Sequence, residues 1–249
     1  MKLAFLYTLA SNQPLFAPYI ATLERSGVEI SHHVDESFLA QAREMSSPAD
    51  EVAVTNKVHQ AIEQIMRKDN PTKIICTCST IGDMAESYSN QHSRMANTTE
   101  ITTIAATTIL RVDRPMADAA ITLGTSTIHV LAALESTLKP TTDLIQQCLQ
   151  AKNIGNKNVI TRVVPNAWEH LQKNGNSTAY AQVVADYILS NYYNYYQRES
   201  NDQVVIVLAQ ASMSPAVDLL SESQTAKCPT ILTSPGTCIA FLLNDMKGH

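Results

Sequence analysis

The chain has 249 residues, of which 45% are hydrophobic and 16% charged, enough apolar material for the core of one large domain or two small ones. A formal net charge of -5 excludes a basic surface for nucleic acid, so a ligand must be recognised by local groups. Residues 3–9 are apolar but too short to span a bilayer, and no small-residue cleavage site follows them. We therefore expect a buried first strand in a soluble, cytoplasmic protein without membrane contact.

Apolar runs of strand length alternate with segments of helical period along the chain. The predicted strands are 2–9, 28–34, 73–78, 107–112, 128–134, 158–164, 203–209 and 229–233. The predicted helices are 14–26, 49–68, 80–95, 114–122, 140–152, 178–198, 214–226 and 236–246. This alternation predicts an α/β protein whose parallel sheets are covered by helices on both faces.

A weak internal repeat divides the pattern in two. Residues 5–11 resemble 130–136, residues 74–80 resemble 206–212, and residues 108–111 resemble 230–233, at offsets of 125, 132 and 122 residues. Because the three matches occur in the same order, we infer two pseudo-symmetric halves, each a parallel-sheet αβα sandwich. The predicted halves are 1–115 and 116–249, with the C-terminal segment a candidate to pack against the first half. Ligands of parallel sheets bind beyond the carboxyl ends of the strands, so we expect one active site in the cleft between the halves.

The candidate pocket residues lie at the ends of the predicted strands in four places, and most of them are small and polar. They are Ser11 and Asn12, then Cys78, Ser79 and Thr80, then Ser136 and Thr137, and finally Gln210, Ala211 and Ser212. Such residues commonly cap helices, which is one interpretation of this pattern. A helix start lined with hydroxyls also suits a carboxylate, and this second interpretation predicts a small mono- or dicarboxylate as the ligand.

Five cysteines, an odd number, occur in the chain, and we expect them to be reduced thiols rather than a disulfide framework. Cys78 is the candidate reactive thiol because it ends a buried run and precedes a predicted helix start, where Thr80 and Asp83 fit a capping box. Free N–H groups and the helix dipole there would favour a thiolate. The alternative is a buried, inert cysteine. We interpret Cys76 and Cys148 as core residues.

The chain lacks the motifs of several cofactor and metal sites. Its seven glycines form neither G-x-G-x-x-G nor a Walker loop, and no H-E-x-x-H motif or carboxylate cluster occurs. There is no G-x-S-x-G elbow of a serine hydrolase. These absences count against a nucleotide ligand, a catalytic metal and a serine hydrolase.

Cys78-Ser79-Thr80, at the end of a predicted strand, resembles the Cys-Asn-Thr motif of aspartate/glutamate and hydantoin racemases. Residues 208–212, Leu-Ala-Gln-Ala-Ser, lie where the second half of these enzymes carries Leu-Gly-Cys-Thr-His or a relative. The resemblance extends over most of the chain. It implies a cofactor-independent isomerase built from two α/β halves, in which two cysteines exchange a proton at the substrate's α-carbon. It also implies a homodimer and an amino acid or small carboxylic acid as substrate.

The sequence departs from this family at the second cysteine, where Gln210 stands. An amide does not titrate near neutral pH, so a second proton-transfer group would have to be Cys238, Ser212 or a water molecule. Without such a group, a decarboxylase or another carbon–carbon lyase that uses Cys78 alone is the alternative, as in the related arylmalonate decarboxylase. A non-catalytic protein that binds small acids is the second alternative.

Three further residues are candidates for substrate binding. Arg114 follows the strand 107–112 and would pair with a carboxylate, or with a neighbouring aspartate on the surface. Thr233 and Ser234 occupy the matching place in the second half, where they bind substrate or cap a helix.

Overall fold

The computed structural model describes residues 1–95, 107–155, 157–193, 204–222 and 229–247. The chain forms two compact units, Met1–Val112 and Asp113–His249. Within the described ranges, no helix combines the length and the apolar character that crossing a bilayer requires.

The first unit is built on a parallel sheet whose described strands follow the order β2-β1-β3-β4. These strands are β1 (Lys2–Tyr7), β2 (Glu29–Val34), β3 (Lys73–Cys76) and β4 (Thr108–Arg111). Its helices are α1 (Gln13–Arg25), α2 (Ser37–Glu44), α3 (Pro48–Asp69) and α4 (Gly82–Met95), and the 3-10 turn η1 (Ala10–Asn12) joins β1 to α1. The chain runs from β1 to β2 on one side and later to β3 on the other. The carboxyl ends of β1 and β3 therefore form the switch point, where ligands of open parallel sheets bind.

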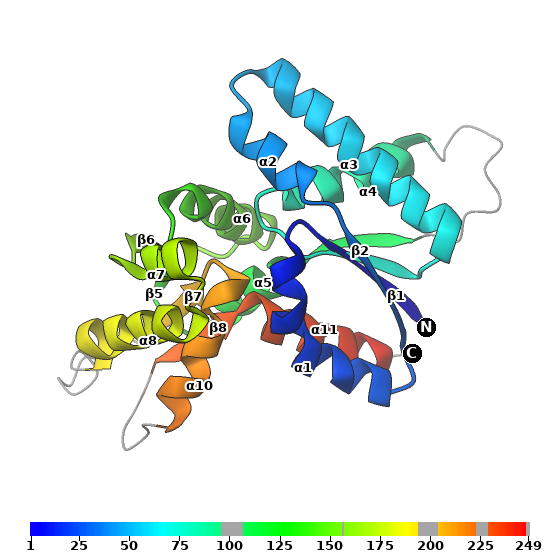
Figure 1. The fold of residues 1–249 in the computed structure, drawn as a ribbon. Coiled ribbons are helices and arrows are strands. Elements are labelled where there is room, and N and C mark those ends of the chain that lie inside the picture. Colours follow the sequence, from blue (N-terminus) through cyan, green and yellow to red (C-terminus); the bar gives the residue numbers. More distant parts are fainter. Residues whose placement is uncertain (96–106, 156, 194–203, 223–228, 248–249) are drawn as a thin grey trace. The chain divides into compact units, whose positions relative to one another are not determined.

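Apolar side chains alternate along β1 and bury both faces of this sheet. Leu6 and, on β3, Cys76 face the helices α2, α3 and α4, where they share a core with Ile62 of α3. Tyr7 points to the opposite face and packs edge-on against Phe16 of α1, with ring centroids 5.8 Å apart. Figure 1 shows α3 and α4 on one side of the strands of this unit and α1 on the other.

The second unit repeats this plan with the strand order β6-β5-β7-β8. Its described strands are β5 (Thr127–Ala132), β6 (Asn158–Val163), β7 (Val204–Leu208) and β8 (Thr230–Thr233). Its helices are α5 (Arg114–Thr122), α6 (Leu138–Ala151), α7 (Ala167–Asn174), α8 (Ser177–Ile188), α10 (Pro215–Glu222) and α11 (Ser234–Lys247). Three short turns complete it, namely η2 (Glu135–Thr137), η3 (Leu189–Tyr193) and η4 (Ala211–Met213). The switch point of this sheet lies at the carboxyl ends of β5 and β7.

Two apolar layers bury the second sheet. Val130 and Val207 pack with α5 and α6, whereas Leu131 and Leu208 pack with α7, α8 and α10. Helix α11 packs against α5 and β8 of the same unit. The inner strand β7 is therefore buried on both sides, and its sequence is a continuous apolar run, whereas the edge strand β6 is mostly exposed.

The repeat predicted from sequence extends to the backbone register. The paired residues are Leu6 with Cys76 in the first sheet and Leu131 with Leu208 in the second. Just beyond these pairs, the N–H of Thr77 donates to the carbonyl of Leu6 at 3.0 Å, and the N–H of Ala209 donates to that of Leu131 at 2.8 Å. The offsets of 125 and 132 residues therefore match equivalent positions in space as well as in sequence. The predicted α/β fold with two similar halves is confirmed.

Each of the eight predicted strands overlaps an observed strand, but some boundaries were wrong. Strand β3 ends at Cys76, so Cys78 lies in the following turn rather than at the strand's last position. Helix α4 begins at Gly82, so Thr80 does not cap it as predicted. The helices α2 and α7 were not predicted, because each has only 8 residues and a short apolar period. The helix predicted at 178–198 extends outside the described residues.

Substitution of Leu131 by alanine tests the central position of β5. Leu131 is fully buried, so we expect the variant to lose about 2–5 kcal/mol of unfolding free energy, measured by urea titration. Val163→Ala is the control, because Val163 lies on the edge strand β6 and is 38% exposed. We expect it to lose less than about 1 kcal/mol of unfolding free energy. Equal losses in the two variants would contradict the assignment of β5 to the centre of the sheet.

Candidate functional site

Cys78 lies in the turn that joins β3 to α4, at the switch point of the first sheet. Its neighbour Thr77 is tied to β1, because its hydroxyl donates to the carbonyl of Leu6 at 3.1 Å in addition to the backbone bond. Cys78 belongs to the core layer that also contains Leu6 and Cys76, and 9% of its surface is exposed. The thiol therefore borders the apolar core and retains limited access to solvent.

The turn that contains Cys78 carries hydrogen-bond donors without a partner. Within the described residues, the backbone N–H groups of Cys78, Ser79 and Thr80 donate no hydrogen bond, and the hydroxyls of Ser79 and Thr80 have no partner. Successive free N–H groups in a turn form a concave site that favours an anion. The turn after β3 can therefore hold a carboxylate without a charged side chain.

Arg111 supports this turn from the neighbouring strand β4. Its side chain is fully buried and pairs with the carboxylate of Asp83 in the first turn of α4. Its Nη2 also donates to the carbonyl of Ser79 at 3.4 Å, and its backbone N–H donates to Oε1 of Glu86 at 3.2 Å. The C=O and N–H of one trans peptide point in opposite directions. By holding the carbonyl of Ser79, Arg111 therefore turns the N–H of Thr80 away from β4.

Gly82 allows this close approach. A Cβ atom at position 82 would lie 2.8 Å from Nε and 3.1 Å from Cβ of Arg111. Any larger residue would therefore displace the buried guanidinium or move the start of α4. The structure therefore uses Arg111 as a support for the turn that contains Ser79.

Ser11 and Asn12 lie at the end of the adjacent strand β1, in and just after the turn η1. Ser11 is exposed, and the side chain of Asn12 makes no capping bond to α1. The capping interpretation therefore does not hold for Asn12, whose amide remains available to a ligand. We refer to Ser11, Asn12, Cys78, Ser79 and Thr80 together as the first strand-end site.

The corresponding residues of the second unit are more fully hydrogen-bonded. We refer to Ser136, Thr137, Gln210, Ala211 and Ser212 as the second strand-end site. The hydroxyl of Thr137 donates to the carbonyl of Leu134 at 2.7 Å, and Ser136 is exposed. Oε1 of Gln210 accepts the backbone N–H of Ala133 at 2.6 Å. Gln210 thus ties the ends of β5 and β7 together, which fixes its amide in the scaffold.

Ser212 is hydrogen-bonded to a buried tyrosine. Its Oγ lies 3.0 Å from the hydroxyl of Tyr180 on α8, which is 1% exposed. Burial raises the pKa of Tyr180 to about 12, although the bond to Ser212 opposes the shift. The phenol therefore stays protonated at neutral pH and can donate to Ser212, which leaves the serine hydroxyl hydrogen free for another acceptor.

The remaining candidates lie close to helix starts of the second unit. Arg114 is the first residue of α5, and its Nη1 lies 3.7 Å from Sγ of Cys148 on α6. Thr233 ends β8 and Ser234 begins α11, and both are buried. Cys238 is fully buried on α11, where burial and the charge of Asp113 raise its thiol pKa to about 12. Such a thiol is unsuited to proton exchange with a substrate.

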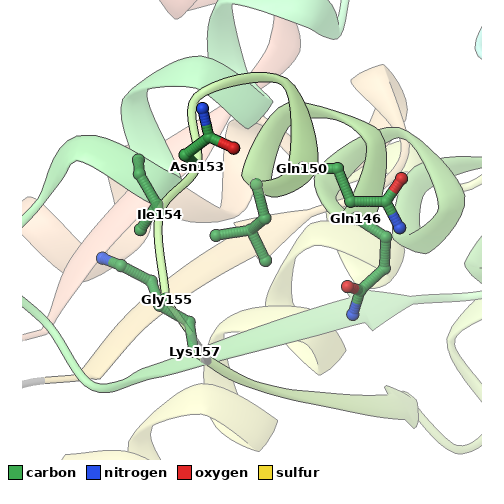
Figure 2. Close-up of a pocket in the computed structure, with 7 residues that line it drawn as sticks. Gln146, Gln150, Asn153, Ile154, Gly155 and Lys157 are labelled. Carbon is green, nitrogen blue, oxygen red and sulfur yellow. The ribbon is translucent and has the colours of Figure 1, made fainter.

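The described residues contain no group of three His, Cys, Asp or Glu side chains that could hold a metal ion. A surface hollow of about 500 Å³ occurs in the second unit, between the end of α6 and the start of β6. Figure 2 shows Gln146, Gln150 and Lys157 lining it. This hollow adjoins the amino end of β6, whereas the second strand-end site follows the carboxyl ends of β5 and β7, so the two are distinct.

Two residues of interest were missed by the sequence analysis. Tyr180 lies in a helix more than thirty residues before Ser212, and no local pattern links the two. Thr8 follows β1 and is fully buried, yet its hydroxyl has no hydrogen-bond partner. The signal for Thr8 was its place in the sequence: it is a polar residue at the next alternate position after Ala4 and Leu6.

No family model matches the chain, and no curated protein matches it in sequence. Solved structures do match. Glutamate racemase RacE1 from Bacillus anthracis superposes with a TM-score of 0.59 over 100% of this chain and 82% of its own, at 13% identity. An aspartate racemase homologue from Pyrococcus horikoshii gives a TM-score of 0.58 over 99% of both chains, at 11% identity.

Related isomerases of other substrates also match. Allantoin racemase from Pseudomonas fluorescens gives a TM-score of 0.57 at 15% identity, over 99% of this chain and 91% of its own. Maleate isomerase from Pseudomonas putida gives 0.53 at 12% identity, over 99% and 93%. The chain therefore has the fold of the aspartate/glutamate racemase superfamily, as its sequence resemblance predicted. These structural neighbours are racemases and isomerases, and the likeness is one of fold.

Replacement of Gly82 by alanine tests the support that Arg111 gives to the turn. Alanine would normally favour a helix start, but here its Cβ meets the buried guanidinium. We expect a loss of about 1–3 kcal/mol in unfolding free energy, measured by urea titration. Gly124→Ala is the control, because no atom lies within 4 Å of a Cβ there. A neutral or stabilising Gly82→Ala would show that Arg111 moves aside at no cost.

Proposed function

We propose that this chain is a cofactor-independent isomerase of the racemase type, which acts on a small carboxylic or amino acid through the thiolate of Cys78. The observation that carries the proposal is the turn after β3, where Cys78, at 9% exposure, shares the turn with unpaired N–H and hydroxyl donors of the described residues. The racemase superfamily fold supports it independently.

In the proposed reaction, the Cys78 thiolate removes the α-proton and becomes a thiol. The electron pair of the C–H bond passes into the adjacent carboxyl group as an enolate. Donors of the first strand-end site would stabilise that charge, because preorganised N–H and O–H groups act strongly where water is excluded. Return of a proton to the opposite face completes an inversion without any change in composition. Ser136, Thr137 and Ser212 are proposed to act on the same substrate, with Ser212 or a water molecule supplying the returning proton.

A second candidate is a carbon–carbon lyase that uses Cys78 alone. The observation in its favour is the bond from Ala133 to Gln210, which fixes a group that cannot titrate at the place equivalent to Cys78. In a decarboxylation, the C–C electron pair would form the enolate, carbon dioxide would leave, and the thiol of Cys78 would protonate the α-carbon. That reaction needs a single proton donor.

Incubation with candidate acids in deuterated water tests both the proposed isomerase and the alternative lyase. The panel consists of glutamate and aspartate, which occur in the names of two structural neighbours, together with malonate derivatives for the lyase. We expect α-deuteration with inversion of one of them by the wild type, followed by mass spectrometry and chiral chromatography. Cys78→Ala should lower the rate by at least about 100-fold, because it removes the base.

Cys148→Ala is the matched control, since Cys148 is buried on α6 away from the strand ends. It should retain the wild-type rate. Release of carbon dioxide in place of inversion would support the lyase. Binding without exchange or turnover, or exchange that survives in Cys78→Ala, would contradict the proposed isomerase.

Restoration of a second thiol tests the role of Gln210. We expect Gln210→Cys to raise the ratio of inversion to α-deuteration above that of the wild type, because a thiol can return a proton where an amide cannot. Gln210→Ala, which also removes the bond to Ala133 but adds no acid, is the control and should leave the ratio unchanged. An equal ratio in both variants would indicate that another group already supplies the second proton.

A further inference from the structure

Thr8 carries two buried donors without a hydrogen-bond partner. It is fully buried and directly follows β1, and its hydroxyl oxygen has no partner in the structure. Within the described residues, its backbone N–H donates no hydrogen bond either. Buried polar groups are almost always hydrogen-bonded, because loss of hydration without a replacement bond is costly. Two such groups in one residue at a switch point indicate a binding role.

The second unit shows what the same position does when it has a partner. Thr8 corresponds to Ala133, since Leu6 and Leu131 occupy equivalent places in the two ladders. The neighbouring bonds agree: the N–H of Asp35 donates to the carbonyl of Tyr7 at 2.9 Å, and that of Val164 donates to the carbonyl of Ala132 at 2.8 Å. At the next residue, the N–H of Ala133 donates to the amide oxygen of Gln210 at 2.6 Å.

In the first unit, the residue equivalent to Gln210 is Cys78. A cysteine side chain ends at Sγ, which takes the place of Cγ in glutamine, so it stops two bonds short of an amide oxygen. No sulfur contact joins Cys78 to Thr8 within the described residues. Cys78 packs in the same core as Leu6 and Cys76, and Thr8 and Cys78 each lie two residues beyond the ladder pair Leu6–Cys76. Among the described residues, neither the thiol of Cys78 nor another protein group supplies an acceptor for Thr8.

We propose that the N–H and the hydroxyl of Thr8 form a two-donor site for a carboxylate or enolate oxygen of the substrate, held beside Cys78. This inference rests on the proposed function, because it assigns the oxygen to the acid on which Cys78 acts. The site binds the oxygen on which charge grows as the α-proton leaves. Two fixed donors aimed at such an oxygen stabilise the transition state more than the ground state. Thr8 is thus assigned to the catalytic groups.

Thr8→Val removes the hydroxyl and preserves the shape of the side chain, and Thr8→Ser keeps the hydroxyl. The first readout is thermal unfolding without ligand. Thr8→Val removes an unsatisfied buried group, so we expect its midpoint to rise by about 2–4 °C. Thr125→Val is the matched control, because Thr125 is also buried with an unpartnered hydroxyl but precedes the amino end of β5. It should show a similar rise.

The second readout is protection of Cys78 from iodoacetamide by graded malonate, maleate and glutamate, with alkylation measured at the Cys78 peptide by mass spectrometry. We expect the concentration for half-protection to rise about tenfold or more in Thr8→Val, the size expected for a lost bond to a charged oxygen. The half-protection concentration of Thr8→Ser should stay within about threefold of the wild-type value. That of Thr125→Val should equal the wild-type value.

The outcomes separate this inference from the proposed function. Equal protection in wild type and Thr8→Val overturns the two-donor site, while Cys78-dependent exchange in the same preparations leaves the proposed function standing. A lower unfolding midpoint in Thr8→Val also overturns the site, because the hydroxyl would then have a structural partner. Failure of all three acids to protect the wild type, together with no exchange, overturns both.

Discussion

The backbone ladder between β1 and β3 is the constraint on which the first strand-end site depends. Leu6 is paired with Cys76, and the N–H of Thr77 continues the ladder to the carbonyl of Leu6 at 3.0 Å. This register decides at which residue the chain leaves the sheet and which face each side chain takes. A slip of one residue would turn Cys78 to the opposite face, because side chains alternate along a strand. Burial of both faces of the sheet opposes such a slip, so the core sets the position of the thiol.

The second unit has the equivalent backbone ladder, between β5 and β7, but different residues follow the ends of its strands. The pairs Leu6–Cys76 and Leu131–Leu208 are equivalent, yet the turns beyond them differ in hydrogen bonding. In the second unit, Gln210 satisfies the N–H of Ala133, and Tyr180 holds Ser212. In the first unit, the donors of the turn at Cys78 are unpaired within the described residues. The buried side chain of Arg111 on β4 donates to the carbonyl of Ser79 in that turn. The two units thus share the backbone ladder, and the unpaired donors described here lie in the turn at Cys78 in the first unit.

The fold was predictable because it depends on features that a sequence displays directly. Apolar runs indicated all eight strands, and three short matches indicated the repeat. Boundaries were less accessible, since β3 ends at Cys76 although the apolar run continues to Cys78. Helix α7 follows Asn166, whose φ of 62° ends the preceding segment through a left-handed residue, and no apolar period marks that event. The unpaired state of Thr8 could not be predicted, because satisfaction of a hydroxyl depends on neighbours that are distant in sequence.

The same dependence on neighbours separates the thiols of this chain. By composition alone, Cys78 and Cys238 are equivalent candidates for proton transfer. Cys238 has no exposed surface and lies near the charge of Asp113, and both raise its thiol pKa, so the protonated thiol is favoured at neutral pH. Cys78 borders the same kind of apolar core, but it lies in a turn with unpaired donors and limited solvent access. Of these two thiols, Cys78 is therefore the one whose surroundings suit proton transfer. Neighbours decide the state of Ser212 in the same way, because the protonated phenol of Tyr180 can donate to its oxygen and leave the serine proton free for another acceptor.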